Sequence, residues 1–353
     1  MQQQLTLTDV EALAAEQLDP QWCAYFAGGS CAERTLEENI AAFGRWRPRQ
    51  RVLRGIERVS TATTVLGQAL ATPVVVAPVA YQRMAHPDAE SGMARAATAS
   101  GAGFCLSTFA TESASAVAVA APGAVRFLQV YVFRDRGVTD ELIAQALDAG
   151  FTAVFLTVDL PVIGSRDRER RARWAFPEES LPSVRYALGR GLAGSWLELV
   201  DPALDWSYLD RLCASLSVPV VVKGILEPED AVLAAENGAA GIVVSNHGGR
   251  QLDGVGSTID ALPGIVDAVG DRLEVLLDGG VRRGTDVAVA LALGARTVLA
   301  GRLPLWGLAA GGEQGAHAVL ELLREELAVA LHLMGCASAT DLGQEHVARI
   351  SAP

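Results

Sequence analysis

Residues 241–254 read GIVVSNHGGRQLDG, a short β-branched strand that runs directly into a histidine, two glycines and an arginine. A turn after the strand would need only Gly and Asn. It would not explain the imidazole of His247 or the guanidinium of Arg250. Both side chains follow the carboxyl end of the strand closely. We therefore expect a bound anion and a transferred proton at this point of the fold.

The same kind of apolar run, bounded by turn residues, recurs along the chain. The other runs are TPVVVAPV (72–79), GFCLS (103–107), RFLQVYV (126–132), AVFLTVD (153–159), VPVVVKG (218–224), EVLLDGG (274–280) and TVLAGR (297–302). Alanine-rich segments with helical spacing lie between most of them, at 89–101, 140–150, 229–239 and 285–295, and several end on Gly as a helix C-cap does. Continuous rather than alternating hydrophobicity indicates strands buried on both faces, and hence the parallel sheet of an α/β protein.

Eight strand–helix units within about 230 residues fit a (β/α)8 TIM barrel, and a doubly wound sheet is the alternative. The number of strands favours the barrel, and so do the polar residues at the carboxyl ends of nearly all of them. A barrel brings these ends to one face, where active sites form. The residues concerned are Gln129, Tyr131, Thr157, Asp159, Lys223, Ser245, His247, Asp278, Gly301 and Arg302.

One connection is longer than the others. The insert at residues 160–217 separates the fourth and fifth predicted strands and is rich in Gly, Pro and Arg. Because long loops are usually functional, we interpret it as a lid over the barrel mouth. Residues 1–70 form a largely helical extension, with ALAAEQ and TLEENIAAF as its clearest pieces. No linker separates this extension from the barrel at 72–335, so residues 1–353 are predicted to form a single domain.

The composition limits the kinds of partner. The net charge is −12 and half of the residues are hydrophobic, which argues against a nucleic-acid surface and allows a large core. The five cysteines are scattered without a metal-binding spacing, as expected for free thiols in a reducing compartment, and no metal site is predicted. No signal-peptide pattern and no persuasive membrane span is visible. The sequence therefore predicts a cytoplasmic protein without a membrane partner.

Two glycine-rich loops are candidates for a phosphate site. TIM barrels often bind phosphate after strands seven and eight, where this chain reads DGGVRRGTD (278–286) and AGRLPLWG (300–307). Glycines allow close backbone approach, and Arg282 and Arg302 supply donors for phosphate oxygens. Lys223, at the end of a buried strand, could form a Schiff base as in an aldolase or stabilise negative charge on a ring. Flavin mononucleotide (FMN) satisfies both the ring and the phosphate.

The sequence resembles the FMN-dependent 2-hydroxy acid oxidase and dehydrogenase family, which includes glycolate oxidase, lactate oxidase and mandelate dehydrogenase. The resemblance runs from about residue 8 to about residue 350, and SNHGGRQLD (245–253) is its most specific element. Supporting stretches are APVAYQRMAHPDAE (77–90), LQVYVFRDR (128–136), TVDLPVIGSRDRERR (157–171), VKGI (222–225), LDGGVRRGTDV (277–287) and GRLPLW (301–306).

The resemblance implies a role for each matching residue. His247 is the active-site base, Asp159 pairs with its imidazolium, Tyr131 hydrogen-bonds near the substrate hydroxyl, and Lys223 lies at the flavin N1 and O2 edge. The residues implied to hold the substrate carboxylate are Tyr25, Arg166 and Arg250. The residues implied to contact the flavin ring are Ala80, Ser107, Gln129, Thr157 and Ser245. The residues implied to hold the ribityl chain and phosphate are Asp278, Gly280, Arg282, Gly301 and Arg302.

Two departures from the family concern the substrate side chain. Many members read Pro-Thr-Ala-Met where this chain has PVAY (78–81), and Phe109 stands where others carry Trp. Tyr81 and Phe109 are therefore predicted to flank the side chain, with Ile163 on the lid side. The tryptophans are interpreted as packing residues, with a position at the border of the pocket left open for Trp174 of the lid. The variant APVAYQ most resembles the hydroxymandelate oxidase branch, which implies an aromatic (S)-2-hydroxy acid such as mandelate.

The predicted reaction yields the 2-oxo acid, with O2 as the acceptor and hydrogen peroxide as the second product. A soluble dehydrogenase with a quinone-type acceptor is an alternative, as is an outcome in which peroxide decarboxylates the 2-oxo acid before release. A Schiff-base aldolase or another flavin barrel that uses Lys223, and a catalytically inactive flavoprotein that acts as a binding module, also remain open. A homo-oligomer, tetramer or octamer, is predicted.

Overall fold

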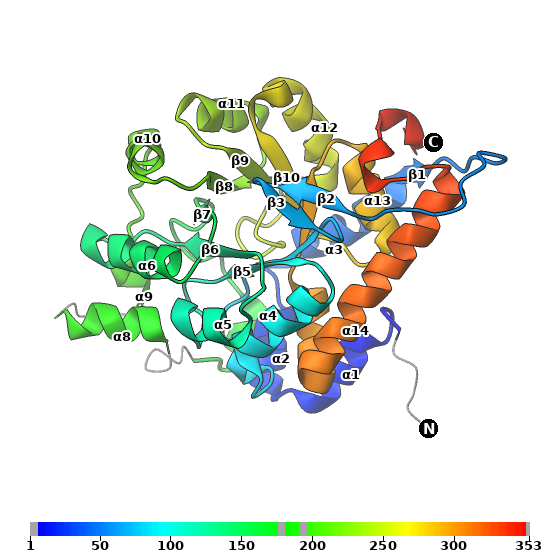
Figure 1. Cartoon of the computed structure of the whole chain (residues 1–353). Coiled ribbons are helices and arrows are strands. Elements are labelled where there is room, and N and C mark those ends of the chain that lie inside the picture. Colours follow the sequence, from blue (N-terminus) through cyan, green and yellow to red (C-terminus); the bar gives the residue numbers. More distant parts are fainter. Residues whose placement is uncertain (1–5, 176–180, 191–195, 351–353) are drawn as a thin grey trace.

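The computed structural model describes residues 6–175, 181–190 and 196–350. Eight parallel strands form a closed barrel in chain order, and the last strand pairs with the first (Figure 1). They are β4 (Val74–Val76), β5 (Gly103–Leu106), β6 (Arg126–Val130), β7 (Val154–Thr157), β8 (Val220–Ile225), β9 (Gly241–Val244), β10 (Glu274–Asp278) and β11 (Thr297–Ala300). Each predicted apolar run contributes one strand, so the predicted (β/α)8 TIM barrel is confirmed.

Helices follow the strands and cover the outside of the barrel. They are α4 (Ala89–Ala99), α5 (Ala114–Ala120), α6 (Arg136–Asp148), α10 (Trp206–Ser215), α11 (Pro228–Glu236), α12 (Thr258–Val269), α13 (Gly284–Ala292) and α14 (Arg302–Met334). The backbone of α14 leaves helical geometry at Gly311 and Gly312, so this element consists of two helices joined at a kink. None of the helices in the described ranges is both long and apolar enough to cross a membrane.

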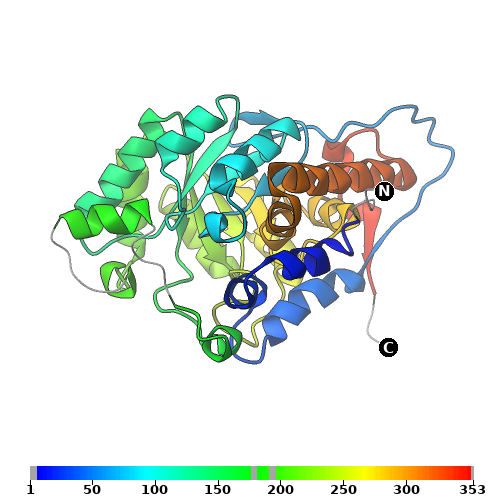
Figure 2. The same cartoon turned by 90° about the horizontal axis from the view of Figure 1, so that it is seen from below.

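The first 70 residues close both ends of the barrel. Helices α1 (Val10–Gln17), α2 (Pro20–Ala27) and α3 (Arg34–Ala41) lead to the mouth, and α1 lies beside the orange α14 in Figure 2. The hairpin of β2 (Thr63–Val65) and β3 (Gln68–Leu70) packs its apolar side chains into the barrel interior from the other end. Its turn residues Leu66 and Gly67 both have positive φ, as a two-residue hairpin requires.

The predicted helical extension is therefore correct only for its first part. After a 3-10 turn at residues 42–45, the chain forms β1 (Trp46–Pro48), which pairs antiparallel with β12 (Val347–Arg349). The chain then continues through irregular backbone to the hairpin. The β-branched residues in TATTVLG (61–67) favour a strand over a helix, and they account for the difference.

The insert at residues 160–217 has two parts. Helix α7 (Asp167–Arg171) packs against α2 near the mouth, and α8 (Pro182–Gly189) is tied to the loop after β5 because Ser183 donates to the Thr108 carbonyl. After α9 (Trp196–Leu199), the insert ends in α10, which occupies the place of the fourth outer helix of the barrel. Residues 176–180 and 191–195 of the predicted lid lie outside the described residues.

The barrel interior consists of layers that follow the two-residue period of a strand. We call the apolar layer the lower layer; it comprises Val75, Cys105, Phe127, Phe155, Val221, Val243, Leu276 and Leu299. We call the residues two positions further along each strand the upper layer; they are Ala77, Ser107, Gln129, Thr157, Lys223, Ser245, Asp278 and Gly301. The strand period thus carries the predicted polar residues to the mouth of the barrel.

Candidate active site

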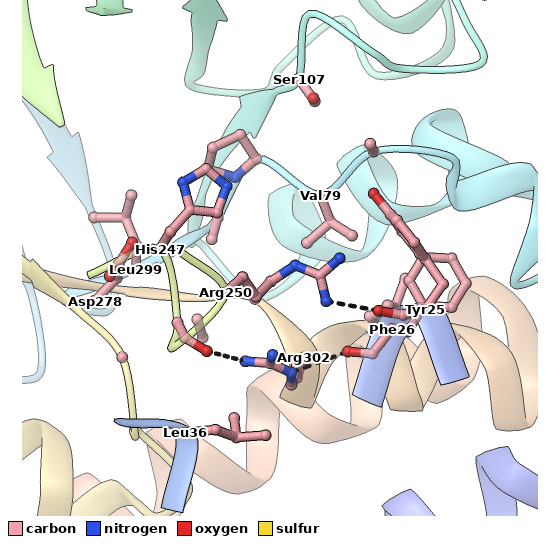
Figure 3. Close-up of a pocket in the computed structure, with 18 of the residues that line it drawn as sticks. Tyr25, Phe26, Leu36, Val79, Ser107, His247, Arg250, Asp278, Leu299 and Arg302 are labelled. Carbon is pink, nitrogen blue, oxygen red and sulfur yellow. Dashed lines mark hydrogen bonds between the residues drawn. The ribbon is translucent and has the colours of Figure 1, made fainter. Parts of the chain in front are cut away.

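A cavity opens above the upper layer, at the carboxyl ends of the strands (Figure 3). Of the predicted site residues, those that line it are Tyr25, Ala80, Tyr81, Ser107, Phe109, Gln129, Tyr131, Thr157, Arg166, Lys223, His247, Arg250, Asp278, Gly280, Arg282, Gly301 and Arg302. Ile163 of the insert also lines it, as predicted, and so does Trp174, for which a position at the border of the pocket was left open. Asp159 and Ser245 lie behind this lining and contact it through hydrogen bonds.

The imidazole of His247 is held from three sides. Its Nδ1 lies 2.8 Å from Oδ1 of Asp159, and its Nε2 lies 3.4 Å from the hydroxyl of Tyr131. The backbone at His247 is left-handed, with φ of 58°, and its N–H donates to Oγ of Ser245. Gly224 of β8 leaves room for the carboxylate, because a Cβ there would lie only 2.6 Å from the Cβ of Asp159. A non-glycine residue in a strained backbone conformation is typical of functional sites.

The ionisation of this pair suits a general base. Burial lowers the pKa of His247, although the carboxylate of Asp159 acts in the opposite direction. Burial by itself would raise the pKa of Asp159, but the charges of His247 and Lys223 outweigh it, and the pKa of Asp159 is lowered. Burial raises the pKa of Tyr131, so its hydroxyl stays protonated. A neutral imidazole beside an ionised carboxylate can accept a proton and stabilise the resulting positive charge.

Two arginines meet at the side of the cavity next to α2 and α7. Arg250 donates through Nη1 to the carbonyl oxygens of Tyr25 and Gly28, at 2.6 and 2.7 Å, and its guanidinium lies 4.7 Å from the ring centroid of Tyr25 (Figure 3). Arg166, at the start of α7, and Arg250 share the carboxylate of Glu169 through Nη1 and Nη2, at 3.2 and 3.1 Å. All these side chains border the cavity, so the buried Arg166, the mostly buried Arg250 and the buried Glu169 lie at one end of it.

Aromatic rings form the walls near these arginines. Trp174 stacks on Tyr25 with ring centroids 4.7 Å apart, and Tyr81 packs edge-on to Tyr25 with a centroid distance of 5.4 Å. Phe109 stacks on Tyr131 at 5.2 Å. The backbone of Tyr81 is left-handed, with φ of 61°, which turns the chain sharply after β4. The cavity is therefore polar at the arginines and the histidine, and aromatic between them.

Lys223 lies at the centre of the upper layer. Its Nζ is 3.0 Å from Oδ2 of Asp278 and donates to Oγ of Ser245 at 2.9 Å. Burial by itself would lower the pKa of Lys223, but Asp278 and then Asp159 outweigh this, and the pKa is raised. A Schiff-base lysine needs a lowered pKa. The ion pair with Asp278 thus argues against the aldolase alternative and leaves a fixed positive charge.

A chain of side-chain hydrogen bonds continues around the upper layer. Gln129 donates through Nε2 to Oγ1 of Thr157 at 3.0 Å, and its Oε1 accepts from Oγ of Ser107 at 3.4 Å and from the N–H of Thr108 at 3.1 Å. These contacts fix the orientation of the amide of Gln129. They place alternating donors and acceptors along one edge of the cavity.

Arg302, at the N-terminus of α14, is partly buried and has no carboxylate among its hydrogen-bond partners in the described structure. It donates to the carbonyl oxygens of Phe26, Gly248 and Gly28 through Nε, Nη1 and Nη2, at 2.9, 2.9 and 2.8 Å (Figure 3). Burial, followed by the charges of the neighbouring arginines, lowers the pKa of Arg302 to about 9. Burial also lowers the pKa of Arg282. A bound anion would relieve both arginines.

The residues present fit FMN. Lys223 and the amide of Gln129 match the polar edge of a flavin ring, and Arg282 and Arg302 match a phosphate. The Oδ1 atom of Asp278 is buried without a hydrogen-bond partner in the described structure, so it is available to accept from a ligand hydroxyl. Gly280, with φ of 82°, lies against α3, where a Cβ would meet the Asn39 carbonyl oxygen at 2.0 Å.

Two features of the site were not predicted from the sequence. Glu169 lies three residues after Arg166 in the run RDRERR, which contains two acidic residues and no sign of which one turns inward. Asn39 and Asn246 exchange amide hydrogen bonds of 2.8 Å and tie α3 to the loop that carries His247. The position of Asn246, next to His247, was a usable signal, whereas Asn39 had none.

The fold and the chemistry of this site fit a flavin-binding barrel oxidoreductase. The model of the FMN-dependent dehydrogenase family matches residues 14–349, and the chain belongs to this family. It is a 2-hydroxy acid oxidase in class, and FMN is its cofactor.

Individual relatives cover nearly the whole chain. The 2-hydroxyacid oxidase 1 of Homo sapiens is 44% identical over 344 residues, which are 94% of this chain and 93% of that protein. The L-lactate oxidase of Nostoc sp. is 43% identical over 351 residues, which are 96% of each. A structure of a mandelate oxidase mutant with (S)-mandelic acid matches with a TM-score of 0.90 and 38% identity, and covers 99% of both chains.

Proposed function

We propose that this enzyme oxidises an aromatic (S)-2-hydroxy acid, such as mandelate, to the 2-oxo acid, and that O2 is the electron acceptor and is reduced to H2O2. The observation that carries the proposal is the aromatic wall of Tyr81, Phe109 and Trp174 beside the two arginines. The similarity of this chain to a mandelate oxidase structure supports the proposal of an aromatic substrate. The human and Nostoc relatives, named for 2-hydroxy acids and lactate, make a direct comparison of substrates necessary.

Substrate binding begins at the arginines in this proposal. Arg250 and Arg166 hold the substrate carboxylate, and Tyr25, whose ring lies against the Arg250 guanidinium, supports it. Because Nη1 of Arg250 is fixed by two backbone carbonyls, its guanidinium is oriented before the substrate arrives. Such preorganisation removes part of the entropic cost of placing the reacting carbon.

Proton transfer follows at His247. With the carboxylate at the arginines, the 2-hydroxyl group lies beside the pair formed by Nε2 of His247 and the Tyr131 hydroxyl, which are 3.4 Å apart, within hydrogen-bond reach of both. The substrate loses its hydroxyl hydrogen, its α-hydrogen and two electrons. His247 accepts one of the two hydrogens as a proton, and Asp159 stabilises the imidazolium through the 2.8 Å contact at Nδ1. When bound, FMN would accept the two electrons, and the other hydrogen would leave with them as a hydride or separately as a proton. Lys223 holds a positive charge next to bound FMN, and Ala80, Ser107, Gln129, Thr157 and Ser245 position its ring, while Asp278, Gly280, Arg282, Gly301 and Arg302 hold its ribityl phosphate.

An absorbance experiment tests the proposal. Purified enzyme is mixed with (S)-mandelate without oxygen, and we expect the flavin band to bleach. Admission of air should restore the band and release one H2O2 for each 2-oxo acid formed. Bleached enzyme that is stable in air but recovers with a quinone would establish the dehydrogenase alternative, and carbon dioxide release would indicate decarboxylation by peroxide. Failure of every 2-hydroxy acid to bleach the band would contradict the proposal.

Assembly and location stay predictions. The expectation of a homo-oligomer, tetramer or octamer, and of a cytoplasmic enzyme rests on the sequence and on the resemblance to the family. Light scattering of the purified protein would determine the oligomeric state.

A further inference from the structure

Glu169 is a buried acid between the two arginines that are proposed to bind the substrate carboxylate. Its side chain is 11% exposed, and a single oxygen, Oε1, accepts from both Arg166 and Arg250. It lines the same cavity. The proposed reaction assigns no proton transfer to this carboxylate.

The contacts of Arg250 indicate that Glu169 does more than hold this side chain in place. Arg250 is already oriented by the carbonyl oxygens of Tyr25 and Gly28, at 2.6 and 2.7 Å. Loss of Glu169 would therefore leave the Arg250 guanidinium anchored. What Glu169 adds is a negative charge, which a backbone carbonyl cannot supply.

The formal charges at this end of the cavity sum to a single positive charge. Arg166 and Arg250 contribute +2 and Glu169 contributes −1. The other charged groups that line or support the cavity add no positive charge here or belong to the phosphate region: Lys223 is paired with Asp278, and the carboxylate of Asp159 is hydrogen-bonded to the neutral imidazole of His247. One substrate carboxylate therefore neutralises this end, and a second carboxylate would be in excess.

We propose that Glu169 is a specificity-determining residue that restricts the substrate to monocarboxylates. Its carboxylate neutralises one of the two positive charges of Arg166 and Arg250, so one positive charge remains for the substrate. This inference rests on the proposed function, in which these two arginines bind the substrate carboxylate. It adds a substrate class that the site rejects: 2-hydroxy acids with a second carboxylate.

The test compares two small acids that differ by one charge, propionate and malonate. Their dissociation constants are measured with the FMN-loaded enzyme, from the quenching of tryptophan fluorescence and from calorimetry. We expect the wild type to prefer propionate, and Glu169→Gln to move the ratio of the two constants toward malonate by about tenfold or more, since removal of a buried charge a few ångströms away has effects of this size. Glu321→Gln, which breaks an Arg–Glu pair of the same i,i+3 spacing on α14, is the matched control and should leave the ratio unchanged.

The outcomes separate the inference from the proposed function. Glu169→Asp keeps the charge and should retain the wild-type ratio. If Glu169→Gln bound propionate and malonate more weakly by the same factor, Glu169 would be a structural support and the inference would be overturned. An unchanged ratio of the two dissociation constants would overturn it as well. If Arg250→Met left propionate binding intact, the carboxylate site itself would be wrong, and the proposed function would fail with it.

A second measurement needs no variant and covers the case in which Glu169→Gln does not fold. Wild-type binding of malonate is followed as the pH is raised through the second ionisation of this acid. We expect malonate binding to weaken by about tenfold or more relative to propionate, which loses no further proton in this range and corrects for titration of the protein. A malonate affinity that runs parallel to that of propionate would overturn the inference.

Discussion

The lower and upper layers of the barrel lie one strand period apart and serve different purposes. In the lower layer, Phe155 stacks on Phe127 with centroids 5.2 Å apart, and both rings are fully buried. Two residues further along the same strands, Thr157 and Gln129 form a hydrogen bond at the floor of the cavity. His247 follows Ser245 of the upper layer by the same two-residue step. The lower layer thus contributes to stability and the upper layer to the active site. Substitutions in the lower layer should therefore change the free energy of unfolding, and substitutions at the upper layer should change the reaction rate.

The largest effect is expected at His247. The change His247→Asn should leave a folded, FMN-loaded enzyme whose flavin is reduced very slowly by substrate, because the proton acceptor is gone. General-base catalysis contributes about 10²–10⁴-fold, and we expect the upper end. Anaerobic stopped-flow reduction measures the rate, and the thermal midpoint serves as the control that the fold is intact. Reduction within a few-fold of the wild type would remove His247 from the role of base.

The lower layer provides the opposite case. Phe155→Ala should lower the free energy of unfolding by about 3–5 kcal/mol, because it leaves a cavity beside Phe127 in a fully packed interior. Urea titration measures this loss. Reduction of the flavin by substrate at low temperature should stay within a few-fold of the wild type. A large drop in the reduction rate without loss of stability would show that the two layers are not separable.

The variant Arg250→Lys tests whether Arg250 binds the substrate carboxylate. Arg250→Lys keeps the charge but loses the planar donor fork and the contacts of Nη1 with Tyr25 and Gly28. Loss of a charge-assisted hydrogen bond should cost about 1.5–3 kcal/mol in kcat/KM. Steady-state kinetics with the acid and its methyl ester measure the effect. An ester that the wild-type enzyme turns over as well as the acid would contradict carboxylate binding at Arg250.

The charge of Asp159 predicts the direction in which the pH profile of kcat/KM should shift when this residue is replaced. His247 must be neutral to accept a proton, so kcat/KM should fall as the pH falls through the pKa of His247, which burial lowers. The charge of Asp159 raises this pKa, so Asp159→Asn should move the acid limb of the kcat/KM profile to lower pH while the plateau rate falls. A limb that moved to higher pH would mean that Asp159 does not act on His247 through its charge.

Much of this arrangement could be predicted from the sequence, because buried parallel strands are short, continuous apolar runs. Each run corresponds to one strand, and polar residues at the ends of six of the eight runs marked the upper layer, in which Ala77 and Gly301 are the two apolar members. The motif SNHGGRQLD further identified the loop of His247. These signals are local, and period-two alternation then determines which residues share a face.

What the sequence did not show depends on contacts between distant segments. The mutual amide bonds of Asn39 and Asn246 join residues 207 positions apart. Glu169 turns inward because α7 packs against α2, and nothing in the charged run RDRERR indicates this. The hairpin at residues 63–70 differs from the predicted helical extension because its two strands have three residues each, so the β-branched residues Thr63, Thr64 and Val65 are the one local strand signal.

The smallest expected effect concerns the aromatic wall, where Tyr81 and Phe109 line the cavity near the arginines. We expect kcat/KM to be several-fold to about tenfold higher for mandelate than for lactate or glycolate, since an aromatic pair contributes roughly 0.5–1.5 kcal/mol beyond area burial. The opposing possibility is that Tyr81, which is 2% exposed, fills the pocket and leaves room only for a small side chain. Measurement of all three acids and phenyllactate under one set of conditions, with Phe109→Leu as the variant that removes one ring, decides between them. A lead for glycolate that Phe109→Leu did not alter would mean that the rings plug the pocket instead of lining it.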